Sequence, residues 1–118
     1  MGYEMSEFTA IAEHKSNYPN PIEFFAGDTV RLGELDTEFE GWIRVTTGNG
    51  NVGWAPIQYI DFDVGSSAGT ANQNYNAREL DTIVGEKFIL IRNLNDWSLV
   101  RNERGLVGWV PAKTFTPA

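Results

Sequence analysis

The chain has 118 residues, no cysteine, one histidine and a formal net charge of −7. This composition excludes a disulfide framework, a thiolate metal site and a multi-histidine metal centre, and it leaves His14 as the one imidazole for a nucleophilic mechanism. We therefore expect a non-catalytic protein without a cofactor or metal. Because an acidic chain repels phosphate backbones, we expect no nucleic-acid partner either.

The chain also lacks the features of membrane and exported proteins. It contains no run of eighteen apolar residues, and its first residues lack the basic and apolar regions of a signal peptide. The absence of cysteine suits a reducing compartment. We therefore expect a cytoplasmic protein with no membrane partner.

Strand signals recur along the chain, whereas no stretch has a helical period of useful length. Segments with apolar residues at every second position, bounded by Gly, Asn or Asp, predict strands. Tight turns are predicted at residues 48–50 and 102–105, where Gly and Asn supply the positive φ that hairpins need. The sequence thus predicts an all-β fold. Its expected strands lie at residues 29–32, 42–45, 51–54, 87–91 and 97–100.

One pattern occurs twice, at an offset of 55 residues. Trp42 stands 12 residues before Trp54 in a Gly-Trp-x-Pro motif, and Trp97 stands 12 residues before Trp109 in a second one. A Gly residue followed by an acidic residue precedes the two tryptophans of each copy. Such a period indicates two copies of one supersecondary unit.

A segment rich in Gly and Ser separates the two copies. Residues 63–72 are interpreted as a flexible linker, which gives a first domain at residues 1–62 and a second at residues 73–118. Charge is uneven along the chain, because residues 1–64 hold eleven acids against three bases and the remainder holds five acids against six bases. An acidic first domain favours a cationic partner.

The order of the motifs resembles the Src homology 3 (SH3) family in its variant bacterial form. In that family an Ala-Leu-Tyr-Asp-Tyr strand leads into a long RT loop, a Gly-Asp pair begins the second strand, a Trp follows the n-Src loop, and Gly-aromatic-x-Pro-x-x-Tyr closes the barrel. Copy 1 carries these motifs at Ala10–His14, Gly27-Asp28, Gly41-Trp42 and Gly53–Ile60. Copy 2 carries them at Ala71–Tyr75, Gly85-Glu86, Asp96-Trp97 and Gly108–Phe115. The resemblance implies two tandem five-stranded SH3-like barrels.

The resemblance also implies a groove lined with aromatic side chains, which family members use for extended proline-rich peptides. The residues support part of this independently, because the period of two directs Trp54 and Pro56 outward if Ala55 fills the core. The same holds in copy 2. The expected ligand-binding residues are Trp42, Trp54, Pro56, Tyr59, Tyr18, His14, Glu38 and Glu40, with a secondary groove at Tyr75, Trp97, Trp109 and Pro111.

Both copies depart from the family pattern at tyrosine positions. In copy 1, Ala12 and His14 replace the two tyrosines of the opening strand. In copy 2, Gln73 and Thr114 stand where tyrosines are expected, and the RT loop is shorter. The groove of copy 1 is therefore half present, and the groove of copy 2 is further from the peptide-binding pattern.

We therefore expect a non-catalytic adaptor that recognises a peptide or partner protein, cationic and proline-containing, mainly through its first domain. Two alternatives remain open. The chain could be a structural or regulatory assembly subunit with degenerate grooves, whose barrels pack on each other or on a homodimer mate, or it could bind cell-wall peptide. The acidic run is also compatible with an ordinary solvated loop.

Overall fold

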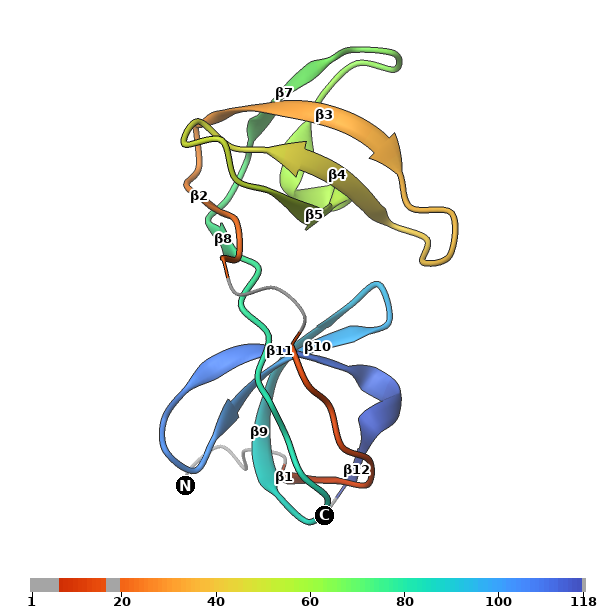
Figure 1. Cartoon of the computed structure of the whole chain (residues 1–118), viewed down its shortest axis with the longest axis vertical. Coiled ribbons are helices and arrows are strands. Elements are labelled where there is room, and N and C mark those ends of the chain that lie inside the picture. The colour runs from red at the N-terminus through yellow and green to blue at the C-terminus, as the bar shows by residue number, and fades with distance from the viewer. Residues whose placement is uncertain (1–6, 17–19, 118) are drawn as a thin grey trace, which may run out of the picture. The chain divides into compact units, whose positions relative to one another are not determined.

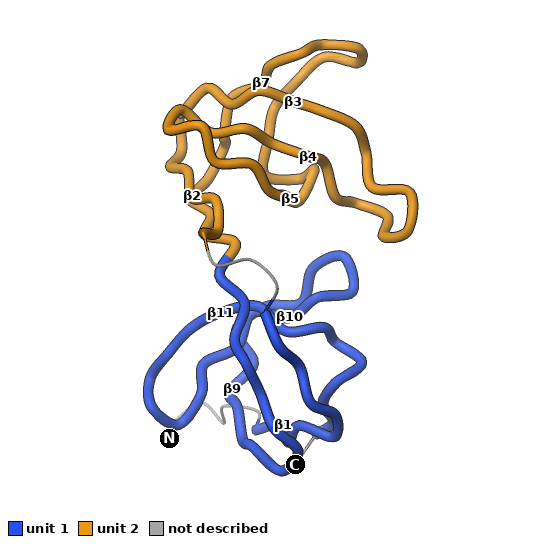
Figure 2. Tube along the Cα trace, viewed as in Figure 1, with its two compact units in different colours: residues 1–18, 78–118 blue, residues 19–77 orange. Residues whose placement is uncertain are grey.

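A computed structural model describes residues 7–16 and 20–117 of the chain, and these residues form an all-β fold with two short 3₁₀ turns (Figure 1). The chain forms two compact units (Figure 2). Unit 1 combines residues 1–18 with residues 78–118, and unit 2 comprises residues 19–77. Within the described part of the chain, no helix has the length and apolar character that crossing a bilayer requires.

Unit 2 is built on a five-stranded antiparallel sheet with the strand order β5-β4-β3-β7-β6. A separate two-stranded ladder joins β2 to β8. The elements of unit 2 are β2 (Glu23–Phe24), β3 (Thr29–Leu35), β4 (Trp42–Thr46), β5 (Val52–Pro56), η1 (Ile57–Tyr59), β6 (Ile60–Asp61), β7 (Ala68–Ala71) and β8 (Tyr75–Asn76).

Unit 1 repeats this plan with the strand order β11-β10-β9-β1-β12. Its 3₁₀ turn lies between β11 and β12, as η1 lies between β5 and β6 in unit 2. The elements of unit 1 are β1 (Glu7–Ala10), β9 (Lys87–Leu94), β10 (Trp97–Asn102), β11 (Val107–Pro111), η2 (Ala112–Thr114) and β12 (Phe115–Pro117).

The two copies exchange their first strands. β1, from copy 1, pairs with β9 and β12 of copy 2, with Phe8 opposite Phe88. β7, from copy 2, pairs with β3 and β6 of copy 1, with Gly69 opposite Val30. Ala10 and Ala71 occupy equivalent places, because one lies opposite Phe115 and the other opposite Ile60. Each sheet therefore contains strands from both copies.

The exchange continues into the segments that follow the first strands. In unit 2, Ala77 N–H donates to the Ile22 carbonyl at 3.0 Å, and β8 pairs with β2. In unit 1, the backbones of His14 and Thr82 donate to each other's carbonyls at 3.1 and 2.8 Å. The first arm of each RT loop thus pairs with the second arm of the other copy's loop.

The two compact units differ from the expected domain division at residues 1–62, 63–72 and 73–118. Residues 68–71, which fall in the expected linker, form strand β7. This strand pairs with β3 on one side and with β6 on the other. A Cβ placed on Gly69 would lie 2.6 Å from Cγ2 of Ile60 and 2.9 Å from the Asp61 carbonyl oxygen. Glycine is present there because the strands approach closely, a requirement that composition alone cannot distinguish from flexibility.

Backbone hydrogen bonds do not close either five-stranded sheet into a barrel. Among the described strands, no ladder joins β5 to β6 or β11 to β12. The prediction of an all-β fold is confirmed, whereas closed five-stranded barrels are not.

Apolar side chains on one face of each sheet form the cores. Unit 1 buries Phe88, Val100 and Val110 with Ala10, which arrives on the exchanged strand. Unit 2 buries Phe24, Ile22, Val30, Val45 and Ala55 in the equivalent way. Unit 1 therefore loses a core residue if β1 leaves, and the exchange is part of its stability.

The glycine of each Gly-Trp-x-Pro motif packs against a side chain from the second arm of an RT loop. A Cβ on Gly53 would lie 3.1 Å from the Ile22 side chain, and one on Gly108 would lie 2.8 Å from Leu80. The two motifs thus share a packing reason for their glycine, in addition to the role of the tryptophan that follows.

Gly69→Ala tests whether residues 68–71 are a packed strand. We expect the substitution to lower the free energy of unfolding by about 1–3 kcal/mol, because the added methyl group overlaps Ile60 and the Asp61 backbone. Gly48→Ala is the control, since nothing lies within 4 Å of a Cβ at that exposed turn. Chemical unfolding of the full chain, followed by tryptophan fluorescence, provides the measurement. Equal stability of the two variants would support the linker interpretation instead.

Candidate functional site

The outer face of the β4–β5 hairpin carries the aromatic residues of copy 1. The register places Trp42 opposite Pro56 and Arg44 opposite Trp54, so these four side chains share one side of the sheet. The alternate residue Ala55 lies on the core side and has no exposed surface, as the alternation predicts.

This face is less open than an exposed stacking platform. Pro56 is fully buried and Trp42 exposes only 6% of its surface, whereas Trp54 is half-buried. The guanidinium carbon of Arg44 lies 5.5 Å from the centre of the Trp54 ring, within cation–π distance. Trp42 and Pro56 therefore contribute mainly to packing, and Trp54 is the accessible aromatic residue, with a cation already on its ring.

Tyr75 reaches unit 2 with the exchanged segment. Its ring meets the Tyr59 ring edge-to-face, with centroids 5.7 Å apart at 82°, and it lies 5.3 Å from the Phe24 ring. Its hydroxyl donates a hydrogen bond of 3.0 Å to the backbone carbonyl of Trp54. Tyr59 and Tyr75 expose only 5% and 6% of their surfaces; they pack against each other, and Tyr75 also packs against Phe24. Copy 2 thus supplies one of the two tyrosines that copy 1 lacks.

His14 belongs to unit 1, whereas Trp42, Trp54 and Tyr59, with which the sequence grouped it, belong to unit 2. Its ring meets the Trp97 ring edge-to-face at 5.7 Å, and its Nε2 lies 2.9 Å from Oε1 of Glu79. His14 was expected beside Trp54 and Tyr75 beside Trp97. In the structure His14 lies in the unit of Trp97, and Tyr75 lies in the unit of Trp54. The signal in the sequence was the complementary loss of tyrosines, since each copy lacks one where the other retains it.

The aromatic face of unit 1 is the equivalent of the one in unit 2. Trp97 lies opposite Pro111, and Leu99 lies opposite Trp109. Trp109 is buried, and its backbone N–H and carbonyl are both bonded to the segment at residues 78–80. Trp97 remains half-buried. This face therefore offers less exposed aromatic surface than its expected four residues suggest.

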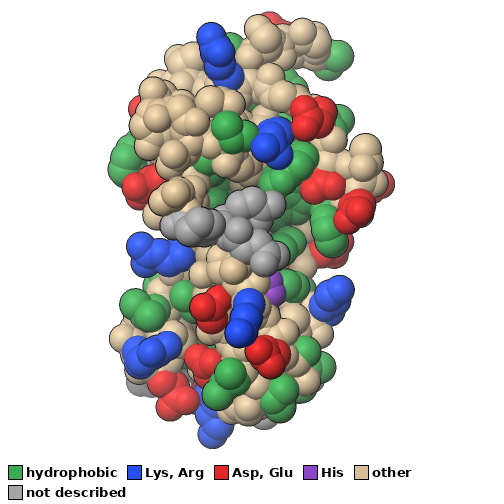
Figure 3. Space-filling view, viewed as in Figure 1, with side chains coloured by type: hydrophobic (Ala, Val, Ile, Leu, Met, Phe, Trp, Pro, Cys, Tyr) green, Lys and Arg blue, Asp and Glu red, His purple; other side chains and the backbone are tan. Residues whose placement is uncertain are grey.

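The acidic loop between β3 and β4 has both a structural and an exposed part. The Asp36 carboxylate accepts hydrogen bonds from the backbone N–H groups of Glu38 and Phe39 at 2.8 and 3.2 Å, so it fixes the turn. Glu38 and Glu40 are exposed. Figure 3 shows acidic side chains beside hydrophobic ones over this loop. Tyr18, which was expected nearby, lies outside the described residues.

The units differ in charge. Unit 2 holds eight acids and two bases, a formal charge of −6, whereas unit 1 holds eight acids and seven bases, a charge of −1. Unit 2 therefore combines the larger aromatic cluster with the stronger negative field. In the described part of the chain, no group of three or more His, Asp or Glu residues could hold a metal ion.

The pKa of Glu79 is raised above its ordinary value, chiefly because burial disfavours the charged carboxylate. The hydrogen bond from His14 and its positive charge oppose this shift, and the negative charge of Asp81 adds to it. Glu79 is the titrating group that links the two exchanged RT arms of unit 1, since His14 comes from copy 1 and Glu79 from copy 2.

We expect Glu79 to make stability depend on pH. A carboxyl group whose pKa is raised by folding binds a proton more tightly in the folded state, so the free energy of unfolding falls as pH rises from 4.5 through the raised pKa. Glu79→Gln removes this titration and should flatten the stability profile between pH 4.5 and neutrality. Thermal unfolding across this range measures it, with the exposed Glu13→Gln as control. Identical profiles for wild type and Glu79→Gln would contradict the assignment.

Comparison with known proteins finds one similarity, which covers most of the first copy. Residues 8–63 match the family model of the variant SH3 domain. No curated protein and no solved structure matches the chain. The matched segment includes β1, which the structure places in unit 1, so the family sequence is divided between the two units. Residues 8–63 are thus similar to an SH3-type domain, a class of domain that generally serves as a non-catalytic protein–protein interaction module.

Proposed function

We propose that the protein is a non-catalytic adaptor in which unit 2 binds a cationic, proline-containing segment of a partner protein. The observation that carries this proposal is the aromatic cluster of unit 2. Copy 2 completes the cluster with Tyr75, and it lies in the unit with a charge of −6. SH3-type domains use aromatic faces of this kind for extended proline-rich peptides.

The proposal also includes a tandem arrangement. Copy 2 follows the same element order as copy 1, since β9, β10, β11 and η2 repeat β3, β4, β5 and η1. We infer that copy 2 is a second SH3-like repeat of the variant bacterial form and that the protein acts in the cytoplasm.

Trp54 is the anchor in this proposal. Its ring is half-buried, while Trp42 and Pro56 are packed beneath the same face. The carbonyl of Trp54 is held by the Tyr75 hydroxyl at 3.0 Å. The buried residues therefore hold the Trp54 ring in place, and this ring makes the contact with the ligand. A ring that is already fixed loses little conformational entropy on binding.

Arg44 regulates access to this anchor. Its guanidinium already lies over the Trp54 ring, at 5.5 Å. A cationic ligand that stacks on Trp54 must displace Arg44, which costs the existing cation–π contact and adds a like charge nearby. Arg44 is also one of the two bases in unit 2. The native residue thus weakens the site that the neighbouring acids create.

The exposed acids act mainly on the rate of association. Glu38 and Glu40 are exposed on the loop that precedes Trp42. Exposed charges steer an oppositely charged partner but add little to affinity at physiological salt, because solvent and ions screen them.

A second candidate is favoured by the burial of the aromatic residues. Trp42, Pro56, Tyr59 and Trp109 are all buried, as residues with a purely structural role would be. In this alternative the protein is an assembly or regulatory subunit, and its interaction surface lies elsewhere. The experiment below separates the two candidates.

We expect Trp54→Ala and Arg44→Gln to change binding in opposite directions. The probe is a synthetic N-acetylated peptide that alternates proline with arginine, titrated by calorimetry. Trp54→Ala should weaken binding at least about tenfold, the cost of truncating an aromatic hot spot. Arg44→Gln should tighten binding about twofold to fivefold, because the competing cation–π contact is removed.

Two further variants provide the controls. Trp97→Ala, in unit 1, should leave the affinity unchanged. Reversing Glu38 and Glu40 to Lys should slow association, with an effect that shrinks as salt rises. If Trp54→Ala and Trp97→Ala cause equal losses, or if the peptide does not bind the wild type, the assignment to unit 2 fails and the assembly role is favoured.

A further inference from the structure

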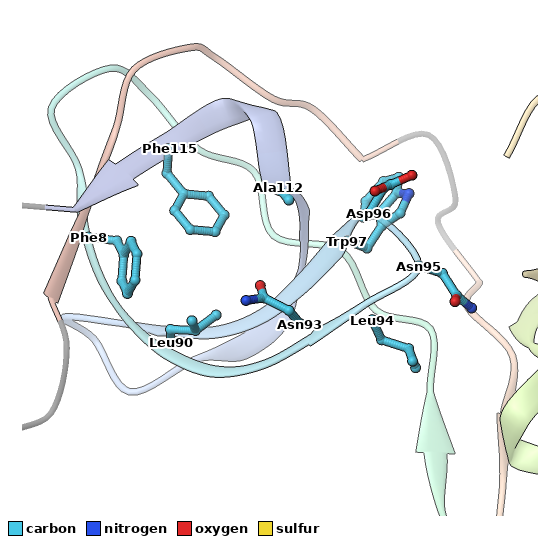
Figure 4. A pocket seen from close by; sticks show the side chains of 9 residues that line it. All are labelled: Phe8, Leu90, Asn93, Leu94, Asn95, Asp96, Trp97, Ala112 and Phe115. Carbon is cyan, nitrogen blue, oxygen red and sulfur yellow. The ribbon is translucent and has the colours of Figure 1, made fainter. Parts of the chain in front are cut away.

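Unit 1 contains a pocket of about 440 Å³ that the proposed function does not use (Figure 4). It shares only Trp97 with the aromatic face of unit 1 described above. The pocket combines elements from both copies, because Phe8 comes on the exchanged strand β1 and its other lining residues come from copy 2.

One end of the pocket is apolar. The rings of Phe8 and Phe115 meet edge-to-face, with centroids 5.3 Å apart at 88°, and Leu90 lies beside them (Figure 4). Phe115 and Leu90 also pack against the core of unit 1, so they are held in place. All three side chains are half-buried and present surface to the pocket.

A polar pair occupies a position that is apolar in the other unit. Asn93 lies opposite Ser98 in the ladder between β9 and β10, whereas the equivalent pair between β3 and β4 is Leu35 with Ile43. Ser98 is fully buried and its hydroxyl donates a hydrogen bond to Oδ1 of Asn93. Burial of a hydroxyl costs stability unless it is bonded, and the Asn93 oxygen provides this bond.

The Asn93 amide can therefore donate to a ligand. Its oxygen is occupied by Ser98, and the described residues provide no acceptor for its NH₂ group. The amide points into the space bounded by Phe8, Phe115 and Leu90 (Figure 4). An NH₂ group with two donors suits a carbonyl oxygen.

The other end of the pocket carries one negative charge. Asp96 is the one charged residue among those that line the pocket, and it is exposed. No basic side chain in the described part of the chain pairs with it. It occupies a two-residue hairpin turn with Asn95, at φ values of 69° and 50°, and its carbonyl accepts a 3.0 Å bond from Ala112. The turn therefore fixes the backbone from which this carboxylate projects.

The equivalent position in unit 2 cannot form this pocket wall. Gly69 stands where Phe8 stands in unit 1, since each lies two residues before the alanine that faces the last strand. A Cβ there would already lie 2.6 Å from the Ile60 side chain. The aromatic wall is thus a property of unit 1 and of its exchanged strand.

We propose that this pocket binds a small ligand that carries an aromatic ring, an aliphatic ammonium group and a carbonyl oxygen. The ring enters between Phe8, Phe115 and Leu90, the carbonyl accepts from Asn93, and the ammonium lies near Asp96. The volume suits one ring with a short polar tail, at the lower end of the range for small-ligand sites. The N-terminal aromatic residue of a peptide and a free aromatic amino-acid amide both have this chemistry.

Titration of the full chain with L-phenylalaninamide, followed by amide NMR spectra, tests the proposal. We expect saturable shifts at Phe8, Leu90, Asn93 and Asp96. Two matched ligands each remove one feature: 3-phenylpropanamide lacks the ammonium and glycinamide lacks the ring. Both should bind more weakly than phenylalaninamide, the first by about twofold to fivefold, as expected for an exposed ion pair.

Two variants assign the contacts. Asp96→Asn retains a residue that favours this turn and should weaken phenylalaninamide while leaving 3-phenylpropanamide unchanged. The double variant Asn93→Leu with Ser98→Ile installs the pair of the other unit and should abolish binding of both, while the spectrum stays that of a folded protein.

A tripeptide with a free N-terminal Phe distinguishes the two sources. If it binds more tightly than phenylalaninamide, the ligand is a peptide N-terminus, and if it binds equally or more weakly, the ligand is a free amine. The absence of saturable shifts, or equal binding of all three small ligands, would overturn the proposal. Binding of phenylalaninamide that is unaffected by Asp96→Asn would overturn it as well.

Discussion

The antiparallel pairing of β1 with β9 and of β7 with β3 determines which side chains share a unit. Each pairing joins a first strand from one copy to the remaining strands of the other, and backbone bonds between the RT arms extend it. The consequence is that neither copy contains its own complete sheet. A tandem repeat ordinarily gives two independent domains. Here each unit needs the first strand of the other copy to complete its sheet.

The exchange changes the chemistry of both aromatic faces. It brings Tyr75 to Tyr59 and Trp54 in unit 2, and it brings His14 to Trp97 and Glu79 in unit 1. Unit 2 gains an aromatic residue, while unit 1 gains a titratable pair. The losses of tyrosine at His14 and Thr114 are therefore complementary, because the exchange brings the retained Tyr59 and Tyr75 together in unit 2.

Local features of the fold could be predicted from the sequence, because strand alternation and turn residues act within a few positions. The alternation around Ala55 and Val110 correctly identified core-facing residues. Two features could not be predicted. Thr9 with Ala10 is identical to Thr70 with Ala71, so these two residues do not indicate which sheet each strand joins. The burial of Trp42 and Pro56 was also missed, since alternation specifies a face but not what packs on it.

Cysteine pairs placed on the exchanged strands test the exchange most directly, because the chain has no cysteine of its own. Thr29 lies opposite Thr70, and Thr9 lies opposite Lys87. If each copy used its own first strand, Thr9 would take the place of Thr70 beside Thr29. At low protein concentration, Thr29→Cys with Thr70→Cys should form an intramolecular disulfide, and Thr9→Cys with Thr29→Cys should remain reduced. The reverse result would contradict strand exchange, and with it the composition of both aromatic faces.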